Sequence, residues 1–75
     1  MKKTISVVAL FQKDSYIKPL FIIFNNTKYP IDRILKIELN SSLKSGGAGL
    51  RYTVRISNNL RYLFFEEDHW FIEKV

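Results

Sequence analysis

The chain has a single histidine, His69, which directly follows the acidic run Glu66-Glu67-Asp68. A histidine beside carboxylates can act as a general base or bind a hard metal ion. General-base catalysis also needs a positioned partner in an enclosed pocket, whereas four consecutive polar residues are typical of a solvated turn. The chain has no cysteine, which excludes thiol catalysis, disulfide scaffolds and cysteine-based zinc sites. We therefore expect a protein that is not an enzyme, with no catalytic residue, no metal site and no cofactor.

The glycine-rich stretch from Lys44 to Gly49 is the second candidate, because its composition suggests a phosphate-binding loop. It has neither the G-x-x-x-x-G-K-[ST] nor the G-x-G-x-x-G spacing. It also leads into a strand pattern, so no helix N-terminus would face a phosphate. A serine nucleophile has no support either, since no G-x-S-x-G segment is present. The stretch is predicted to be a flexible connector.

Charge is the strongest functional signal in the sequence. The chain has 12 Lys and Arg against 7 Asp and Glu, a net charge of +5, and its pI is near 9.7. Residues 1–37 hold the whole excess, with seven cations and two acids. A basic pI is the first indication of nucleic-acid binding, although surplus lysines also serve solubility in ordinary small domains.

The elements that position these residues follow from the hydrophobic period. A chain of 75 residues is long enough for one domain, over residues 1–75, and a hydrophobic content of 47% supports one core. Segments 4–12 and 20–24 are apolar on both faces, which predicts two strands that are covered on both sides. The opening Met1-Lys2-Lys3 and its apolar run look like a secretory signal. The run is too short, however, and no small-x-small cleavage site follows, so we expect a first strand in a soluble, cytoplasmic protein.

The stretch 29–39 fits both a helical and a strand period. Pro30 and the β-branched residues favour a short turn at 31–33 and a strand at 34–40. Three strands follow, at 50–57, 60–66 and 69–75, joined by predicted two-residue turns at 58–59 and 67–68. Such turns fix the register, so the numbers of paired residues should sum to 117 in the first hairpin and to 135 in the second.

These registers predict two faces. The core face carries Tyr52, Val54, Leu63, Phe65, Trp70 and Ile72. The other face carries the rows Arg55–Tyr62–Glu73, Thr53–Phe64–Phe71 and Arg51–Glu66–His69. Exposed aromatic rows usually mark an interface, so either the N-terminal strands or a partner should cover this face. The predicted fold is all-β, a single antiparallel meander of five or six strands that curls into a roll or small barrel.

The second face carries the functional prediction. Basic residues between aromatic side chains suit a single-stranded nucleic acid, since they contact phosphates and stack on bases. The candidate partner-binding residues are Arg51, Arg55, Tyr62, Phe64 and Phe71. We therefore predict a non-catalytic binding module whose partner is nucleic acid or another protein. The alternative is a structural or protein-interaction module, a homodimer or accessory subunit, that binds no nucleic acid. Neither a membrane nor a small-molecule substrate is predicted.

The segment Pro30-Ile31-Asp32-Arg33-Ile34-Leu35-Lys36-Ile37 is followed by a glycine-containing loop, the Tyr52/Val54 hairpin and a closing Trp70-Phe71-Ile72-Glu73-Lys74-Val75. In this pattern residues 30–75 resemble small uncharacterised β-rich proteins of low-GC Gram-positive bacteria. The resemblance rests on generic strand residues and does not extend to the N-terminal strands. It implies only a small β-rich fold and transfers no functional residue.

Overall fold

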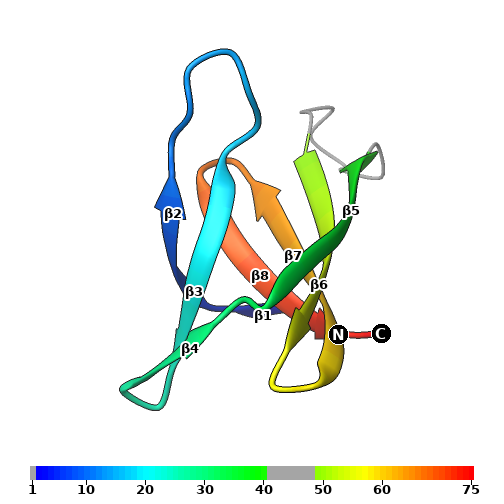
Figure 1. Cartoon of the computed structure of the whole chain (residues 1–75). Coiled ribbons are helices and arrows are strands. Elements are labelled where there is room, and N and C mark those ends of the chain that lie inside the picture. The colour runs from blue at the N-terminus through cyan, green and yellow to red at the C-terminus, as the bar shows by residue number, and fades with distance from the viewer. Residues whose placement is uncertain (1, 41–48) are drawn as a thin grey trace.

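The computed structural model describes residues 2–40 and 49–75, and every regular element in these stretches is a β-strand (Figure 1). The predicted all-β class is therefore confirmed. Most of the predicted connector, residues 41–48, lies outside the described residues. The alternative of a helix over 29–39 is not found, because a strand ends at Pro30 and the next begins at Arg33.

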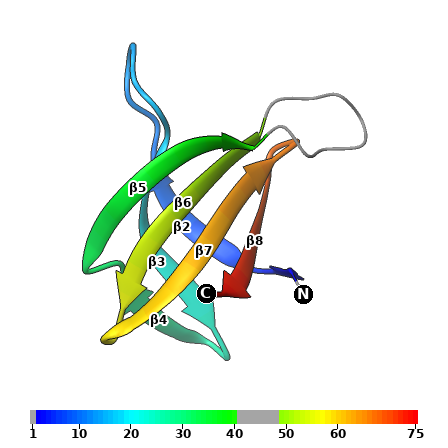
Figure 2. The same cartoon turned by 90° about the vertical axis from the view of Figure 1, so that its right-hand side faces the viewer.

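The larger of two antiparallel sheets has five strands in the order β1-β8-β7-β6-β5. Its strands are β1 (Lys3–Thr4), β5 (Arg33–Asn40), β6 (Gly49–Ile56), β7 (Asn59–Glu66) and β8 (His69–Lys74). The smaller sheet has the order β2-β3-β4 and consists of β2 (Ser6–Leu10), β3 (Lys18–Phe24) and β4 (Thr27–Pro30). The smaller sheet lies behind the larger one in Figure 2, so the two sheets face each other across one layer of side chains.

The prediction of one meander curled into a roll or barrel is wrong, because two short crossings divide the strands between two sheets, neither of which closes over the described residues. At the first crossing the amide of Ile5 donates to the carbonyl of Trp70 at 3.1 Å. This bond ends β1 beside β8, and the chain then enters the smaller sheet. At the second crossing the amide of Ile31 donates to Leu20 in the smaller sheet and that of Asp32 to Arg55 in the larger one, both at 2.9 Å.

Three two-residue turns connect the hairpins, and both residues of each turn have positive φ, as a type I′ turn requires. They are Asn25-Asn26 (51° and 60°), Ser57-Asn58 (48° and 64°) and Glu67-Asp68 (50° and 62°). The turn at 67–68 and the register that sums to 135 are confirmed. The first turn is one residue earlier than predicted, so Ile56 pairs with Asn59 and the sum is 115 rather than 117.

This register error shifts the pairing by two residues, which leaves every side chain on its predicted face. The predicted core face is confirmed, with Tyr52, Val54 and Leu63 fully buried and Trp70 packed against Tyr52 and Phe65 at ring distances of 5.6 and 4.8 Å. The Tyr52 hydroxyl donates to the carbonyl of Ile17, just before β3. The core therefore joins the two sheets.

The smaller sheet supplies its inward side chains, Val7, Ala9 and Ile22 among them, to this core. The prediction that the N-terminal strands are covered on both sides is wrong, because Val8 and Leu10 on the opposite face of β2 are exposed. The smaller sheet packs on the core face of the larger sheet and not on its aromatic face. Within the described residues, each sheet therefore has one outward face with no further layer over it (Figures 1 and 2).

Candidate functional site

All five predicted binding residues lie on the outward face of the larger sheet, since they alternate with buried residues along β6, β7 and β8. The observed register places Arg51, Phe64 and Phe71 in one row. Tyr62 lies in the next row, while Arg55 is opposite Leu60 near the end of the face. The β6 residue is wrong in all three predicted rows, Arg55–Tyr62–Glu73, Thr53–Phe64–Phe71 and Arg51–Glu66–His69, because the turn one residue earlier slides β6 along β7 by two residues.

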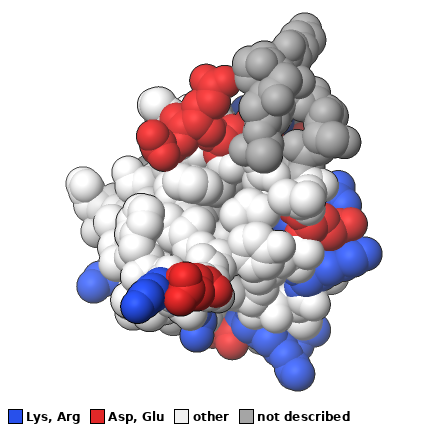
Figure 3. Space-filling model, turned by 90° about the horizontal axis from the view of Figure 1, so that it is seen from above, with Lys and Arg blue, Asp and Glu red and all other residues white. Residues whose placement is uncertain are grey.

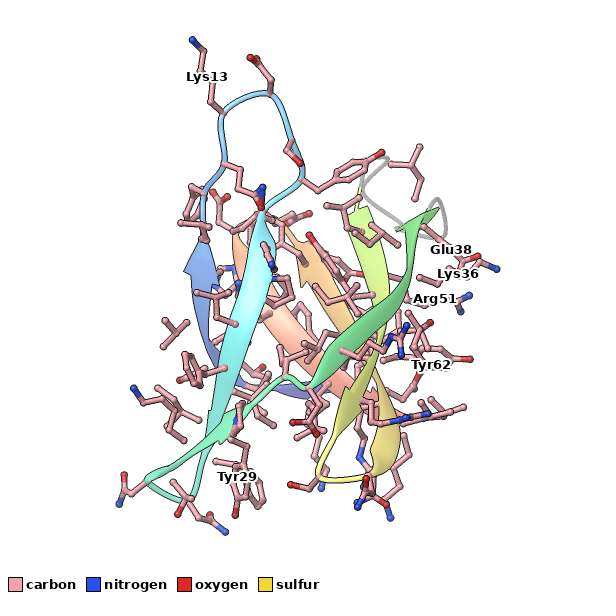
Figure 4. All side chains as sticks on the ribbon, in the orientation of Figure 1. Lys13, Tyr29, Lys36, Glu38, Arg51 and Tyr62 are labelled. Atoms are coloured by element: carbon pink, nitrogen blue, oxygen red, sulfur yellow. The ribbon has the colours of Figure 1, made fainter. Side chains whose placement is uncertain are left out.

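A charged cluster on this face joins β5, β6 and β7. The Arg51 guanidinium donates to Oε1 of Glu38 at 2.6 Å, and Nζ of Lys36 lies 3.4 Å from Oε2 of the same carboxylate. Arg51 also lies over the Tyr62 ring, 4.6 Å from its centroid. Figure 4 shows these four side chains together beside the larger sheet. The hydrogen bond from Arg51, followed by the charges of Arg51 and Lys36, lowers the pKa of Glu38, and the same bond raises the pKa of Arg51.

Glu38 was not among the predicted site residues. Its contact with Arg51 depends on the register of β5 against β6, and a bulge at Leu35 shifts that register between Ile34 and Lys36. The alternation of apolar and polar residues shows on which face Glu38 lies, but it does not show which residue of β6 is its neighbour. The surplus of cations on β6 was the one sequence feature that favoured an acidic neighbour there.

A second cluster explains how the aromatic row avoids water without another layer of chain. Nζ of Lys2 lies 4.6 Å from the centroid of the Phe64 ring, 5.8 Å from that of Phe71, and 3.0 Å from Oε2 of Glu66. Phe64 is only 6% exposed although it lies on the outward face. The lysine stem covers the rings while its charge meets both the carboxylate and the ring faces. The cations of this face therefore serve mainly to shield its aromatic rings from water.

The outward face of the smaller sheet was not predicted to be a site. Its paired rows are Ser6–Ile23–Lys28, Val8–Phe21–Pro30 and Leu10–Lys18. Val8, Leu10 and Ile23 are exposed at 39%, 49% and 38%. Phe21 is half-buried, and Nζ of Lys28 lies 4.8 Å from the centroid of its ring. We call this surface the β2–β3 face; it consists of Ser6, Val8, Leu10, Lys18, Phe21, Ile23, Lys28 and Pro30.

The loop between β2 and β3, at the top of Figure 1, carries two more exposed large apolar side chains. Phe11 follows Leu10 directly and is among the most exposed apolar residues. Tyr16, farther along the loop, is also exposed and borders the space between the sheets beside Ile34 and Tyr52. Seen from this end, the described surface is mostly uncharged, with the charged groups near its margins (Figure 3). Large apolar side chains in neighbouring rows usually mark an interface.

His69 is exposed, and its Nδ1 lies 2.7 Å from the carbonyl oxygen of Glu67 in the preceding turn. No group of three or more His, Cys, Asp and Glu side chains that could hold a metal ion occurs in residues 2–40 and 49–75. The same residues form no helix long and apolar enough to cross a membrane.

Comparisons with protein-family models, with curated proteins and with solved structures find no match. The resemblance of residues 30–75 to small β-rich bacterial proteins therefore gains no support from them.

Proposed function

We propose that the chain is a non-catalytic domain that binds another protein through the β2–β3 face. The observation that carries this proposal is the set of exposed apolar side chains in adjoining rows, with Val8 directly opposite Phe21. Burying such side chains against a partner is favourable by about 25 cal/mol per Å² of apolar surface removed from water. A face of this kind on a small soluble domain is best explained by a partner.

The charges of the β2–β3 face favour a partner other than a second copy of the chain. Its charged residues are Lys18 and Lys28. A two-fold dimer brings the same patch of both copies together, so these lysines would meet lysines. A partner with carboxylates around an apolar centre would complement the face instead.

The outward face of the larger sheet supports nucleic-acid binding less well than its sequence suggested. Stacking on bases needs accessible rings, and a phosphate backbone needs cations that are not already paired. Phe64 is buried, Arg51 is bound to Glu38, and Lys2 is bound to Glu66. These contacts favour a protein as the partner of the domain.

Val8→Asp and Ile23→Asp are each expected to abolish capture of the partner from native cells, because a charge would be desolvated at the centre of the interface. Leu60→Asp is the matched control, since Leu60 is 39% exposed, as is Val8, but lies on the larger sheet. Circular dichroism checks that all three variants fold. The same protein should be captured with wild type and Leu60→Asp and lost with both other variants. Capture that survives in both Val8→Asp and Ile23→Asp contradicts the proposal.

A single-stranded oligonucleotide titrated at low and high salt is expected to show only weak binding that does not saturate. Nucleic-acid binding through Arg51, Arg55 and two further cations would give a slope of about −3 in log K against log salt. In that case Arg55→Ala would flatten the slope by nearly one unit, with Lys18→Ala on the other sheet as the control. Saturable binding with this pattern would restore nucleic acid as the partner.

A further inference from the structure

A cleft of about 590 Å³ opens between the two sheets, at the end where the β3–β4 hairpin approaches the β6–β7 turn (Figure 1). This volume is within the range of about 300–1,000 Å³ that is usual for small-molecule sites. Its walls are largely apolar and come from both sheets: Ile5, Ile22, Phe24, Tyr29, Ile56 and Ile72. Figure 4 shows Tyr29 at this lower end, on the side of the β3–β4 hairpin that faces the β6–β7 turn.

Three cations border the cleft, and they lie on the inward face of the larger sheet. Arg61 is paired with Val54, which is fully buried, and on its other side with Lys74. Lys3 is paired with Ile72, in the row next to that of Arg61 and Lys74. Because paired residues point to the same side, all three side chains project toward the space between the sheets. Among the described residues that border the cleft, Glu73 is the one acid.

The pair formed by Arg61 and Lys74 is informative because like charges directly opposite each other destabilise a sheet. Nη1 of Arg61 donates to the carbonyl of Leu60 at 2.8 Å. The other guanidinium N–H groups and the Lys74 ammonium can donate to an anion placed between them at the mouth of the cleft. The apolar walls behind them indicate that this anion carries an apolar tail. A site of this kind places a few polar groups beside an apolar pocket, so that the head fixes the orientation of the ligand.

We propose that this cleft binds a free single-chain carboxylate of the medium-chain fatty-acid type. The carboxylate accepts hydrogen bonds from Arg61 and Lys74, with Lys3 adding positive charge, and the alkyl chain lies between Ile22 and Ile56. This site is separate from the β2–β3 face, which lies on the other side of the smaller sheet. The domain would therefore combine a small-molecule site with a protein-binding face.

The test is a titration of decanoate, below its micelle concentration, into protein labelled at the isoleucine methyl groups. Saturable shifts are expected for Ile22, Ile56 and Ile72, while Ile34 and Ile37, which are not among the residues that line the cleft, should not move. Decanol has the same tail without the charge and should bind about threefold to tenfold more weakly, as the loss of a partly exposed ion pair predicts.

Arg61→Gln and Lys74→Gln should each weaken decanoate binding by a similar factor, about threefold to tenfold, and leave decanol binding unchanged. Lys18→Gln on the β2–β3 face is the matched control and should have no effect. Val8→Asp should also leave decanoate binding intact, which separates this test from that of the proposed function. Any one of three outcomes overturns the proposal: decanol binding as tightly as decanoate, shifts centred on Ile23, or binding to anionic vesicles without binding to decanoate.

Discussion

Replacing Trp70 with alanine is expected to lower the free energy of unfolding by about 3–5 kcal/mol. Trp70 is 9% exposed, and its ring packs against Tyr52 and Phe65 where the larger sheet meets the smaller one. The substitution would leave a cavity that the neighbouring rings cannot fill without moving. Because small domains have total stabilities of only about 5–15 kcal/mol, this one change should remove a large part of the total.

Urea denaturation followed by circular dichroism measures the effect, since the variant lacks the only tryptophan that fluorescence would report. Trp70→Phe is the control that keeps an aromatic ring and should cost clearly less. Leu60→Ala, an exposed position on β7, should leave the denaturation midpoint nearly unchanged. An unchanged midpoint in Trp70→Ala would show that the indole does not support the core.

The second large effect is a loss of stability at alkaline pH that depends on one tyrosine. Burial, followed by the charge of nearby Tyr16, raises the pKa of Tyr52 to about 12. In the unfolded chain a tyrosine has a pKa of about 10. The folded state therefore favours the protonated phenol, and its contribution is complete below about pH 10. It is lost as the pH rises from about 10 to 12, and the expected loss is about 2–3 kcal/mol.

Unfolding free energies measured between about pH 8 and pH 12 test this expectation, with Tyr52→Phe as the variant. Phenylalanine keeps the ring but removes the hydroxyl that donates to Ile17, so at neutral pH it should cost about 1–3 kcal/mol. Above pH 10 its stability should fall less steeply than that of wild type, because the buried phenol is gone. Tyr62→Phe on the outward face controls for tyrosine ionisation in general. Parallel curves for wild type and Tyr52→Phe would contradict the assignment.

The C-terminal hairpins could be predicted because their alternation is strict and their turns are short. The one error, the turn at Ser57-Asn58, has a clear physical cause. Asn58-Asn59 is an equally good turn sequence, and the two registers differ by two residues, so the hydrophobic pattern is the same in both. The two registers differ in which residues pair across the hairpin on both faces, and on the outward face this decides which residues Arg51 contacts.

The division into two sheets could not be predicted from local pattern. Apolar residues on both sides of β2 and β3 predict strands that are buried on both faces, whereas Val8 and Leu10 are exposed. The deciding features are the crossings at Ile5 and at residues 31–32, whose partners are distant in the sequence. The cleft beside Arg61 and Lys74 was missed for the same reason, since its walls come from both sheets.

The pairing of β1 with β8 also has a consequence for how the molecule opens. Lys3 and Thr4 pair with Ile72 and Phe71, so this short ladder joins regions near opposite ends of the sequence and closes the rest of the chain into a ring. Contacts between residues so far apart form late in folding, because the entropy of closing a long loop opposes them until the intervening structure exists. Lys2, which covers the rings of Phe64 and Phe71, directly precedes this ladder, and Ile5, whose amide donates to Trp70, directly follows it. Separation of the ladder is therefore expected to weaken both contacts. The pairing of Lys3 and Thr4 with β8 thus affects both the access of water to Phe64 and Phe71 and the contact between the two sheets.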